Sequence, residues 1–547
     1  MFSSKRLVSL FVILAVLSTM LVACAPDEPV EVESPKAAEE VDAGEAEAEA
    51  EEEEAAAAEE EAAVPEGPTG TLRVALSTMP NSLFIPLTAE RNADNAATPL
   101  TDSLVYLDRD GDIQPALAES WEISEDGTVY TFHLREGITF HNGEAFNAAD
   151  VIATWETGSV TGEWTDKFTL VQVEKIDDYT VTLTTEAPNP ELLVTIHDFW
   201  AVAPNEYLAE VGVDGFSEFP VGTGPFMFVE WVKGDHITYT ANLDYWREGY
   251  PLVETLIFRP IPESSTRVAA IMADEVDIVG RLSAEEAQSL VGVDGVELIQ
   301  YPVNRIYYIA FNNLTTGLEQ PTMDAKVRQA MNYAVDVDAI IDALFNGYGK
   351  PAAGYVSSGE LGYGAIEPFG YNPEKALELL SEAGYADGFA MDMACPAGAY
   401  MNFEEVCEAT AGYLGEVGIV INLDIMESGQ FWELEANKEL PLFGDSWSTL
   451  SGEALRRLSG ALGGWDAAYS SWSDPVLDDY LAKISTNVNR DERKALYEDL
   501  QVYMQENPPF IYLYEPIAFE AKRTRVMDYY PRPAEDYFLF ETYVVGE

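Results

Sequence analysis

The stretch that decides the fold is DSLVYLDRDGDIQPALAESWEISEDGTVYTFHLREGITFHNGEAFNAADV, residues 102–151. Within TVYTFHL, residues 128–134, one face of an extended chain carries Tyr130, Phe132 and Leu134. This period of two is typical of a half-buried strand. The turn EDG that ends at Gly127 suits a hairpin. The stretch therefore predicts antiparallel strands joined by tight turns.

The acidic run DRDGD, residues 108–112, allows two interpretations. Its spaced aspartates resemble the start of a calcium loop, but its glycine comes too early for an EF-hand and no glutamate closes the loop at position 12. We therefore favour a hairpin turn over a metal site.

Outward from this stretch, strands alternate with helices. Further short strands are expected at residues 72–76, 181–184, 237–240, 256–259, 306–311, 420–425 and 510–514. One helix should begin with Asn372 as N-cap and Pro373 as first residue, and should end at Gly384. Apolar residues at helical spacing predict another helix over 324–345. The pattern indicates a mixed α/β protein with more than one lobe.

The composition limits the partners. The chain of 547 residues has 30 Lys+Arg against 96 Asp+Glu, a net charge of -66, which argues against nucleic acid and anionic lipid headgroups as binding surfaces. Hydrophobic residues make up 47%, enough for a large folded protein. Three cysteines are too few for a disulfide-rich scaffold or a structural zinc site. Cys395 and Cys407 are either a disulfide or buried thiols.

The N-terminus reads as an export signal. Lys5 and Arg6 precede an apolar run that ends in LVAC, residues 21–24. This tetrapeptide resembles the bacterial lipobox, so we expect residues 1–23 to be a lipoprotein signal peptide and Cys24 to carry the lipid. The alternative is an uncleaved anchor helix, although the run is short for a span. Both interpretations put the protein at the outer face of the cytoplasmic membrane, periplasmic or extracellular.

An acidic stalk follows over residues 24–68. Residues 27–66 hold 18 acids, one base and no aromatic residue, so this segment cannot bury enough apolar surface to fold. It carries -17, whereas residues 67–547, with 27 bases and 78 acids, carry -51. The folded part is therefore itself strongly acidic.

Motifs for catalysis are missing from the sequence. It has four histidines and no HExxH pair, phosphate-binding P-loop or GxSxG elbow. A pair of catalytic carboxylates could always be chosen among 96 acids, so such a choice carries no information. We expect no enzyme activity, no cofactor and no metal.

The order of several motifs resembles a known family. After the opening stretch come VGTGPFMFVEW (221–231), YYIAFNN (307–313), DAKVRQAMNYAVD (324–336), NPEKALELLSEAGY (372–385), SWSDPVLDDYLAKI (471–484) and PPFIYLYEP (508–516). Together they resemble the bacterial extracellular solute-binding proteins of family 5, the peptide- and nickel-binding group that serves ABC importers. The resemblance covers nearly all of residues 70–547.

The resemblance implies a fold and a division into domains. The fold would be an α/β, two-lobed clamp like the periplasmic binding proteins (type II, cluster C), with an inserted small α+β domain. Lobe I would take residues 69–302, with the insert at about 95–200, and lobe II would take 303–508. Residues 509–547 would return to lobe I.

The resemblance also implies a function. The protein would be a monomer that captures a small solute, an oligopeptide or a peptide-like molecule, and delivers it to ABC permease subunits with cytoplasmic ATPases. An oligosaccharide or nickel-chelate binder of the same fold is the alternative within binding, although four histidines disfavour nickel. A secreted hydrolase and a sensor domain that presents ligand to a receptor are further alternatives.

Site residues come from one family motif in lobe II, in which an aspartate three residues after a tryptophan pairs with a peptide ammonium. Here the stretch reads GDSWSTLSGEA (444–454), with Leu450 in place of that aspartate and Glu453 at the second acid. We expect a ligand site formed by Asp445, Trp447, Ser448, Thr449, Ser451 and Glu453, facing Ser77, Thr78 and Asn81 across the cleft.

Each of these residues also has a structural interpretation. Trp447 would stack on the ligand or belong to the core, and the hydroxyls would bind ligand carbonyls or cap turns. Trp432 and Tyr355 are weaker candidates. If Glu453 serves the ligand, replacing it with Gln should leave the melting point of the empty protein nearly unchanged.

Overall fold

The computed structural model describes residues 64–87, 95–109, 111–160, 168–449, 452–467 and 469–546. The predictions for the signal peptide, for Cys24 and for most of the stalk lie outside these residues, as does the candidate Ser451. No helix in the described part of the chain is long and apolar enough to cross a membrane.

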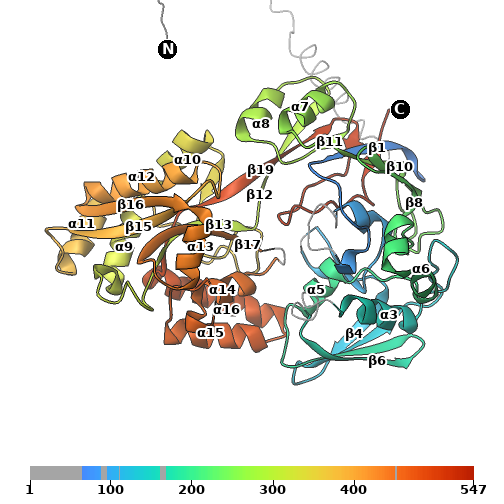
Figure 1. Cartoon of the computed structure of the whole chain (residues 1–547), viewed down its shortest axis with the longest axis horizontal. Helices are drawn as coiled ribbons and strands as arrows, with labels where there is room; N and C mark the ends of the chain where they lie inside the picture. The colour runs from blue at the N-terminus through green and yellow to red at the C-terminus, as the bar shows by residue number, and fades with distance from the viewer. Residues whose placement is uncertain are drawn as a thin grey trace, which may run out of the picture. The chain divides into compact units, whose positions relative to one another are not determined.

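An eight-stranded sheet contains the first strand and the last long strand. In spatial order its strands are β12 (Val296–Pro302), β19 (Tyr514–Arg523), β11 (Ile278–Val279), β1 (Thr69–Leu76), β10 (Val253–Pro260), β9 (His236–Ala241) and β8 (Phe226–Val232), with β14 (Gly349–Pro351) paired to β19. Strand β1 runs parallel to β10 and β11, and its Leu72 and Val74 are fully buried. Helices α7 (Ser264–Met272) and α8 (Ala284–Leu290) lie beside β11 in Figure 1.

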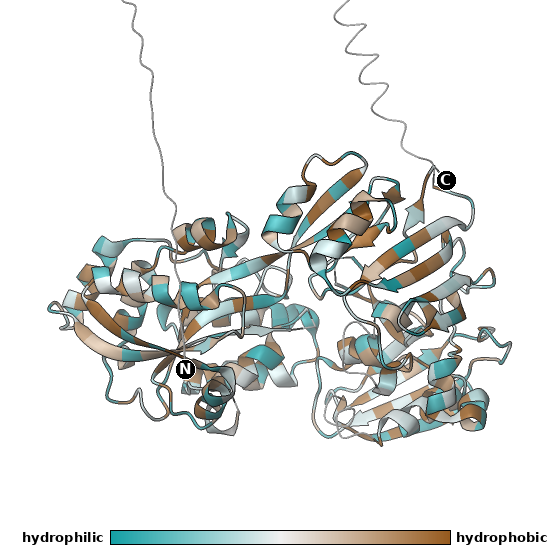
Figure 2. Cartoon of the chain, turned by 45° about the horizontal axis from the view of Figure 1, so that its top comes forward, coloured by the Kyte–Doolittle hydropathy of each residue, from teal (hydrophilic) through white to brown (hydrophobic). Residues whose placement is uncertain are grey.

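A five-stranded sheet forms the second large core. Its order is β16 (Ile419–Glu427), β15 (Phe389–Ala397), β17 (Leu442–Ser448), β13 (Arg305–Phe311) and β18 (Phe510–Tyr512). The helices of this part are α9 (Ala325–Ala334), α10 (Val337–Phe345), α11 (Pro373–Glu382), α12 (Phe403–Glu416), α13 (Ser428–Ala436), α14 (Leu455–Leu462), α15 (Pro475–Thr486) and α16 (Arg490–Glu506). Figure 2 shows hydrophobic residues concentrated on the strands, while the helices carry both hydrophilic and hydrophobic residues.

A four-stranded antiparallel sheet contains the opening stretch. Its order is β4 (Ala118–Ile123), β5 (Val129–Leu134), β7 (Thr180–Thr185) and β6 (Leu170–Asp177). With it go the hairpin β2 (Val105–Leu107) and β3 (Ile113–Pro115), and helices α3 (Ala148–Gly158), α5 (Leu192–Phe199) and α6 (Asn205–Glu218). Near the C-terminus β20 (Val526–Met527) pairs with β21 (Tyr543–Val544). Single 3-10 turns occur at Ile85–Leu87, Thr98–Leu100, Pro321–Met323 and Gly464–Asp466.

Two strand connections join the eight-stranded and five-stranded sheets. Strand β12 ends at Pro302 and β13 begins at Arg305, while β18 ends at Tyr512 and β19 begins at Tyr514. Figure 1 shows β19 running from the five-stranded sheet into the eight-stranded one. Two short connections that run in opposite directions between the same two sheets are the arrangement expected of a hinge.

The local sequence predictions agree with most of these elements. Tyr130, Phe132 and Leu134 on β5 are all buried, as the alternation predicts. Strands occur at all seven further ranges, the last with a break at Leu513. The described residues of the run DRDGD lie in the hairpin turn between β2 and β3, with Gly111 at φ +75°. Asn372 caps α11 through the Lys375 N–H, as expected.

The single helix predicted over 324–345 is wrong. The structure has two helices, α9 and α10, because Val335 adopts an extended conformation and Asp336 accepts a hydrogen bond from the Ala339 N–H as the N-cap of α10. An aspartate that caps a new helix competes with continuation of the old one. The apolar stripe continues across the break because both helices bury Val327, Ile341 and their neighbours in the same core.

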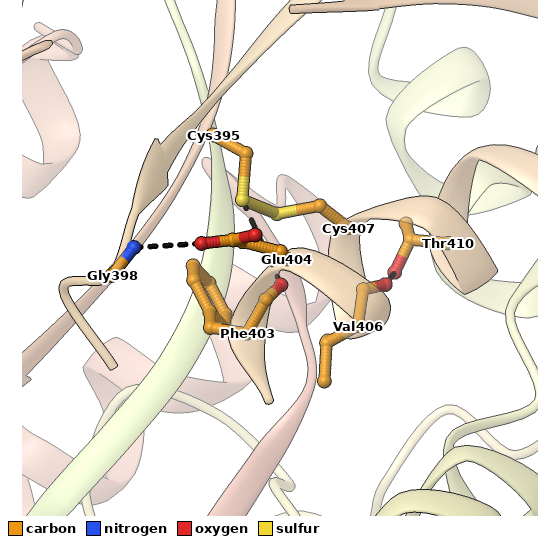
Figure 3. Close-up of a disulfide and its surroundings, with 7 residues drawn as sticks. All are labelled: Cys395, Gly398, Phe403, Glu404, Val406, Cys407 and Thr410. Atoms are coloured by element: carbon orange, nitrogen blue, oxygen red, sulfur yellow. Dashed lines mark hydrogen bonds between the residues drawn. A yellow bond between two sulfur atoms is a disulfide. The ribbon is translucent and has the colours of Figure 1, made fainter. Parts of the chain in front are cut away.

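The question left open for Cys395 and Cys407 is answered by a disulfide between them. Figure 3 shows it joining the end of β15 to the first turns of α12. Glu404 accepts a hydrogen bond from the Gly398 N–H at 2.7 Å, which fixes the same loop. The loop between the cysteines carries Tyr400, whose hydroxyl donates to Asp445 in β17. The disulfide therefore holds this loop against the five-stranded sheet.

Candidate ligand-binding site

A cleft of about 820 Å³ opens between the part that contains the four-stranded sheet and the helical part of the five-stranded sheet. The first wall contains Leu107, Asp108, Arg109, Gly111, Asp112, Ile113, Trp121, Ile123, Tyr130, Pro190, Leu193 and Val194. The second wall contains Ser358, Gly359, Glu360, Leu361, Gly362, Tyr363, Gly452, Glu453, Val488, Arg490, Arg493 and Lys494. Asn304, Arg532, Pro533 and Ala534 complete the lining. Clefts that bury small solutes measure about 300–1,000 Å³.

The first wall is built on the β2–β3 hairpin and on the face of β4 and β5. Asp108 accepts hydrogen bonds from the Asp112 N–H at 2.9 Å and from the Gln114 side chain at 2.7 Å, so both of its oxygens serve the turn. The side chain of Asp112 takes no part in these hydrogen bonds and is exposed at the rim of the cleft. Tyr130 donates to the Asn189 carbonyl at 2.6 Å, and burial raises its pKa to about 12, so the phenol stays neutral.

The second wall contains the first turn and a half of α16. Asn489 caps this helix by accepting from the Asp491 and Glu492 N–H groups. Arg490, Arg493 and Lys494 are three and four residues apart and share one helix face. That face is turned toward the cleft, as the presence of all three in its lining shows.

The loop Ser357–Tyr363 completes the second wall and packs closely at Gly359. A Cβ at this glycine would meet the Asn304 side chain and lie 2.9 Å from Pro533 Cβ, so no larger residue fits. The neighbouring Ser358 donates from its N–H and hydroxyl to Glu515 at the start of β19, at 2.9 and 2.6 Å. The cleft loop is therefore tied directly to a strand that connects the two large sheets.

Among the predicted site residues that the structure describes, Glu453 is the one that lines this cleft. It is not available to a solute in this structure, because Arg493 donates to it twice, from Nε at 3.0 Å and from Nη2 at 2.5 Å. Tyr497 also donates to it, at 3.3 Å. Only 4% of Glu453 and 4% of Arg493 are exposed. This is a buried, geometrically complete ion pair inside the second wall.

Thr449 is hydrogen-bonded to a second buried ion pair, the one between Glu360 and Arg457. Its hydroxyl donates to Glu360, which pairs with Arg457, and the Ser357 N–H donates to Glu360 at 2.7 Å. Both charged side chains are fully buried. Arg457 also donates to the Tyr355 carbonyl at 2.8 Å. Thr449 thus helps to hold the cleft loop and does not itself line the cleft.

Asp445 lies inside the core of the five-stranded sheet. It accepts hydrogen bonds from Tyr308 at 3.1 Å and from Tyr400 at 2.7 Å, and it is 4% exposed. Burial raises its pKa. Beside it, Glu435 has its pKa raised by burial and then by the charge of Asp445. Asp445 does not reach the cleft.

The other candidates on β17 are also turned to protein neighbours. The Trp447 ring packs on Gly460 and stands edge-on to Tyr469 at 5.4 Å. Ser448 accepts from Arg305 at 3.2 Å. Neither residue lines the cleft, so their contact with a ligand stays a prediction.

The candidates after β1 lie elsewhere too. Ser77 accepts from Arg281 at 3.4 Å, and Thr78 and Asn81 are exposed, but none of the three lines this cleft. Of the weaker candidates, Tyr355 is fully buried and stacks on Phe510, and Trp432 stands edge-on to Phe431.

The cleft contains basic residues that were not predicted from the sequence. Its described lining holds five bases and four acids, in a chain with 30 bases and 96 acids. Two of the four acids, Glu360 and Glu453, are buried in the ion pairs described above. The bases whose side chains reach solvent are Arg490 (42% exposed), Lys494 (54%) and Arg109 (48%).

A signal for part of this set is present in the sequence. RDERK, residues 490–494, holds three bases in five residues, which is unusual in so acidic a chain. However, KRTR at 522–525 also holds three bases, in four residues, and its arginines pair with Asp274 and Asp277 at the eight-stranded sheet. Only the folded structure separates the cleft cluster from the structural one.

Comparison with known proteins decides the family. The model of the bacterial extracellular solute-binding proteins, family 5 (middle), matches residues 112–468. The chain belongs to this family. Its members are solute-binding proteins rather than enzymes, they act outside the cytoplasmic membrane, and they work with ABC permeases.

Individual members of the family are similar over most of their length. A glutathione-binding protein of Pectobacterium atrosepticum is 31% identical, over 82% of this chain and 89% of the relative. The heme-binding protein A of Haemophilus influenzae is also 31% identical, over 77% of this chain and 82% of the relative. The solved structure of HbpA2 from Haemophilus parasuis has a TM-score of 0.79 at 27% identity, covering 87% of this chain and all of that one. These matches confirm the predicted fold class.

The site chemistry fits capture of a solute. No group of three or more His, Cys, Asp or Glu side chains that could hold a metal ion occurs among the described residues. The walls offer guanidinium and ammonium donors, the aromatic rings of Trp121 and Tyr130, and the backbone of a glycine-containing loop. These groups bind by hydrogen bonds, charge and stacking.

Proposed function

We propose that this chain captures a peptide-like solute in the cleft between the first and second walls and delivers it to ABC permease subunits with cytoplasmic ATPases. The observation that carries the proposal is the cleft itself. It measures about 820 Å³, lies between parts built on different sheets, and is lined by charged, aromatic and backbone groups. A glutathione-binding relative supports a solute of tripeptide size, since glutathione is a tripeptide.

The two walls are placed to close on a solute. They already meet at the rim, where Arg490 pairs with Asp112 at 2.6 Å. A Cβ at Gly127 would lie 3.1 Å from Val488 on the opposite wall. A solute that contacts both walls favours the closed state by the difference between its contacts in the closed and open states. We assign residues 69–302 and 514–547 to one lobe and residues 303–513 to the other, which moves the return to the first lobe from residue 509 to the start of β19, because β18 pairs with β13 in the five-stranded sheet.

The proposal includes the location and the way of working. The export signal with LVAC at residues 21–24 supports a lipid anchor on Cys24, and the acidic segment after it supports a stalk that holds the clamp away from the membrane. The protein then works as a monomer and breaks no bond in its solute.

A thermal-shift panel tests the function. The panel contains di- to hexapeptides, glutathione, heme, oligosaccharides and Ni²⁺ added to the purified protein. A solute at a hundred times its Kd stabilises the folded state by about 2.7 kcal/mol. We expect stabilisation by short peptides. Stabilisation by oligosaccharides or Ni²⁺ alone would overturn the peptide assignment, and turnover of any panel member would overturn the non-enzymatic role.

A further inference from the structure

The ion pair between Arg490 and Asp112 crosses the mouth of the cleft. Arg490 Nη1 lies 2.6 Å from Asp112 Oδ1 and so joins α16 to the β2–β3 hairpin. About half of each side chain is exposed, 42% for Arg490 and 52% for Asp112. Exposed pairs of this kind contribute about 0–1 kcal/mol to stability, so another carboxylate can replace Asp112 at little cost.

The buried pair next to it behaves differently. Arg493 and Glu453 lie one helical turn deeper and are almost fully enclosed. Separating them would leave a buried charge without its partner, which is strongly unfavourable. Of these two arginines of the second wall, Arg493 is therefore a fixed cation and Arg490 an exchangeable one.

Two further exchangeable cations lie around the same cleft. Lys494 Nζ lies 3.9 Å from Glu498 Oε1, and 54% of the lysine side chain is exposed. Arg109 on the first wall pairs with Glu541 at 3.0 Å and is 48% exposed. The amino end of α16 adds partial positive charge beside Arg490. A cationic solute would find one exposed carboxylate in the described lining, that of Asp112, because the carboxylate of Asp108 accepts hydrogen bonds within the β2–β3 turn.

We propose that the captured solute is anionic and that its carboxylate displaces Asp112 from Arg490. Lys494 and Arg109 provide the second and third positive groups, and the planar guanidinium of Arg490 can donate two parallel hydrogen bonds to a carboxylate. In this structure Asp112 occupies the place on Arg490 that the solute carboxylate would take. This inference rests on the proposed function, because it names the charge class of the solute held in the same cleft.

The displacement predicts opposite effects for the two partners of the pair. If Asp112 competes with the solute, D112N removes a competitor and a repelling charge, and affinity for an anion rises. If the pair only clamps the walls together, D112N and R490Q both weaken the closed state, and affinity falls in both. The sign of the D112N effect therefore separates the two roles.

Isothermal titration calorimetry with matched probes provides the test. The probes are the tripeptides Ala-Glu-Ala, Ala-Ala-Ala and Ala-Lys-Ala together with glutathione, each titrated into the full-length protein. We expect Ala-Glu-Ala to bind about tenfold more tightly than Ala-Lys-Ala, as one extra ion pair in a half-exposed cleft allows. R490Q and K494Q should each weaken Ala-Glu-Ala binding about tenfold, and D112N should strengthen it about threefold.

The matched control is K375Q, which removes an exposed, paired lysine on α11. It should leave every affinity unchanged, and circular dichroism should show the same fold for all variants. Equal affinity for the three tripeptides would overturn the anionic class while leaving the proposed function standing. Weaker Ala-Glu-Ala binding by D112N would overturn the displacement. No binding by any probe would overturn the proposed function and this inference with it.

Discussion

Replacing Glu453 with Gln tests how the second wall of the cleft is held. In the structure Glu453 receives two hydrogen bonds from Arg493 and one from Tyr497, and it is 4% exposed. The substitution keeps one acceptor oxygen but removes the charge. Arg493 would then stay buried without a counter-ion. The structure thus replaces the sequence-based expectation of a nearly unchanged melting point with one of marked destabilisation.

The size of the effect follows from the burial of the pair. Removing one partner of a buried ion pair costs about 3–5 kcal/mol. Because the glutamine oxygen can still accept one hydrogen bond from Arg493, we expect the lower end, about 3 kcal/mol. Unfolding entropy for a chain of this size is roughly 1 kcal/mol per kelvin, so the melting temperature should fall by about 3 °C.

Thermal unfolding followed by circular dichroism measures this fall. The matched control is E498Q on the same helix, which removes an exposed partner of Lys494 and should change stability by less than about 1 kcal/mol. An E453Q melting temperature equal to that of E498Q would refute the reasoning. It would mean that the Arg493–Glu453 pair does not stabilise the wall.

Three further predictions follow from other parts of the structure. Burial raises the pKa of Glu435 above its ordinary 4.5, so its contribution to stability is full below about pH 4.5 and is lost as pH rises; E435Q should flatten this slope in pH-dependent thermal unfolding, and an unchanged slope would contradict the assignment. Replacing both Cys395 and Cys407 with Ser should lower the free energy of unfolding by about 3 kcal/mol in urea, whereas equal stability with the oxidised wild type would count against a stabilising disulfide. Because the net charge is -66, raising the ionic strength from about 0.01 to 0.15 M, which shortens the Debye length from about 30 to 8 Å, should speed association of Ala-Glu-Ala in stopped-flow measurements; an unchanged or slower rate would contradict the expectation that the net charge of the chain governs the approach of the solute.

Local patterns in the sequence predict the fold well where local forces decide it. The alternation in TVYTFHL gives β5 because the buried face of a strand repeats every two residues. The apolar stripe over 324–345 is less informative, since two consecutive helices can bury the same face. The interruption between the two helices is decided by Asp336, which accepts a capping hydrogen bond from the Ala339 N–H. The apolar stripe does not reveal this bond.

The candidate site is harder to predict because the residues that form it are distant in sequence. Arg109 and Arg490 lie 381 positions apart and face one cleft only after the sheets are assembled. The motif around Trp447 supplies the site candidates through the family resemblance, but in this chain Asp445 and Thr449 are engaged by Tyr400 and Glu360. Motif spacing does not show that such groups are already satisfied by protein partners.

The most direct test is a crystal structure of the complex with the tightest-binding peptide of the panel. The account predicts ligand density in the cleft between the β2–β3 hairpin and α16, with a ligand carboxylate on Arg490 and Asp112 moved away from it. Density against Trp447 and Ser77 outside this cleft, or an intact Arg490–Asp112 pair beside a bound peptide, would contradict it.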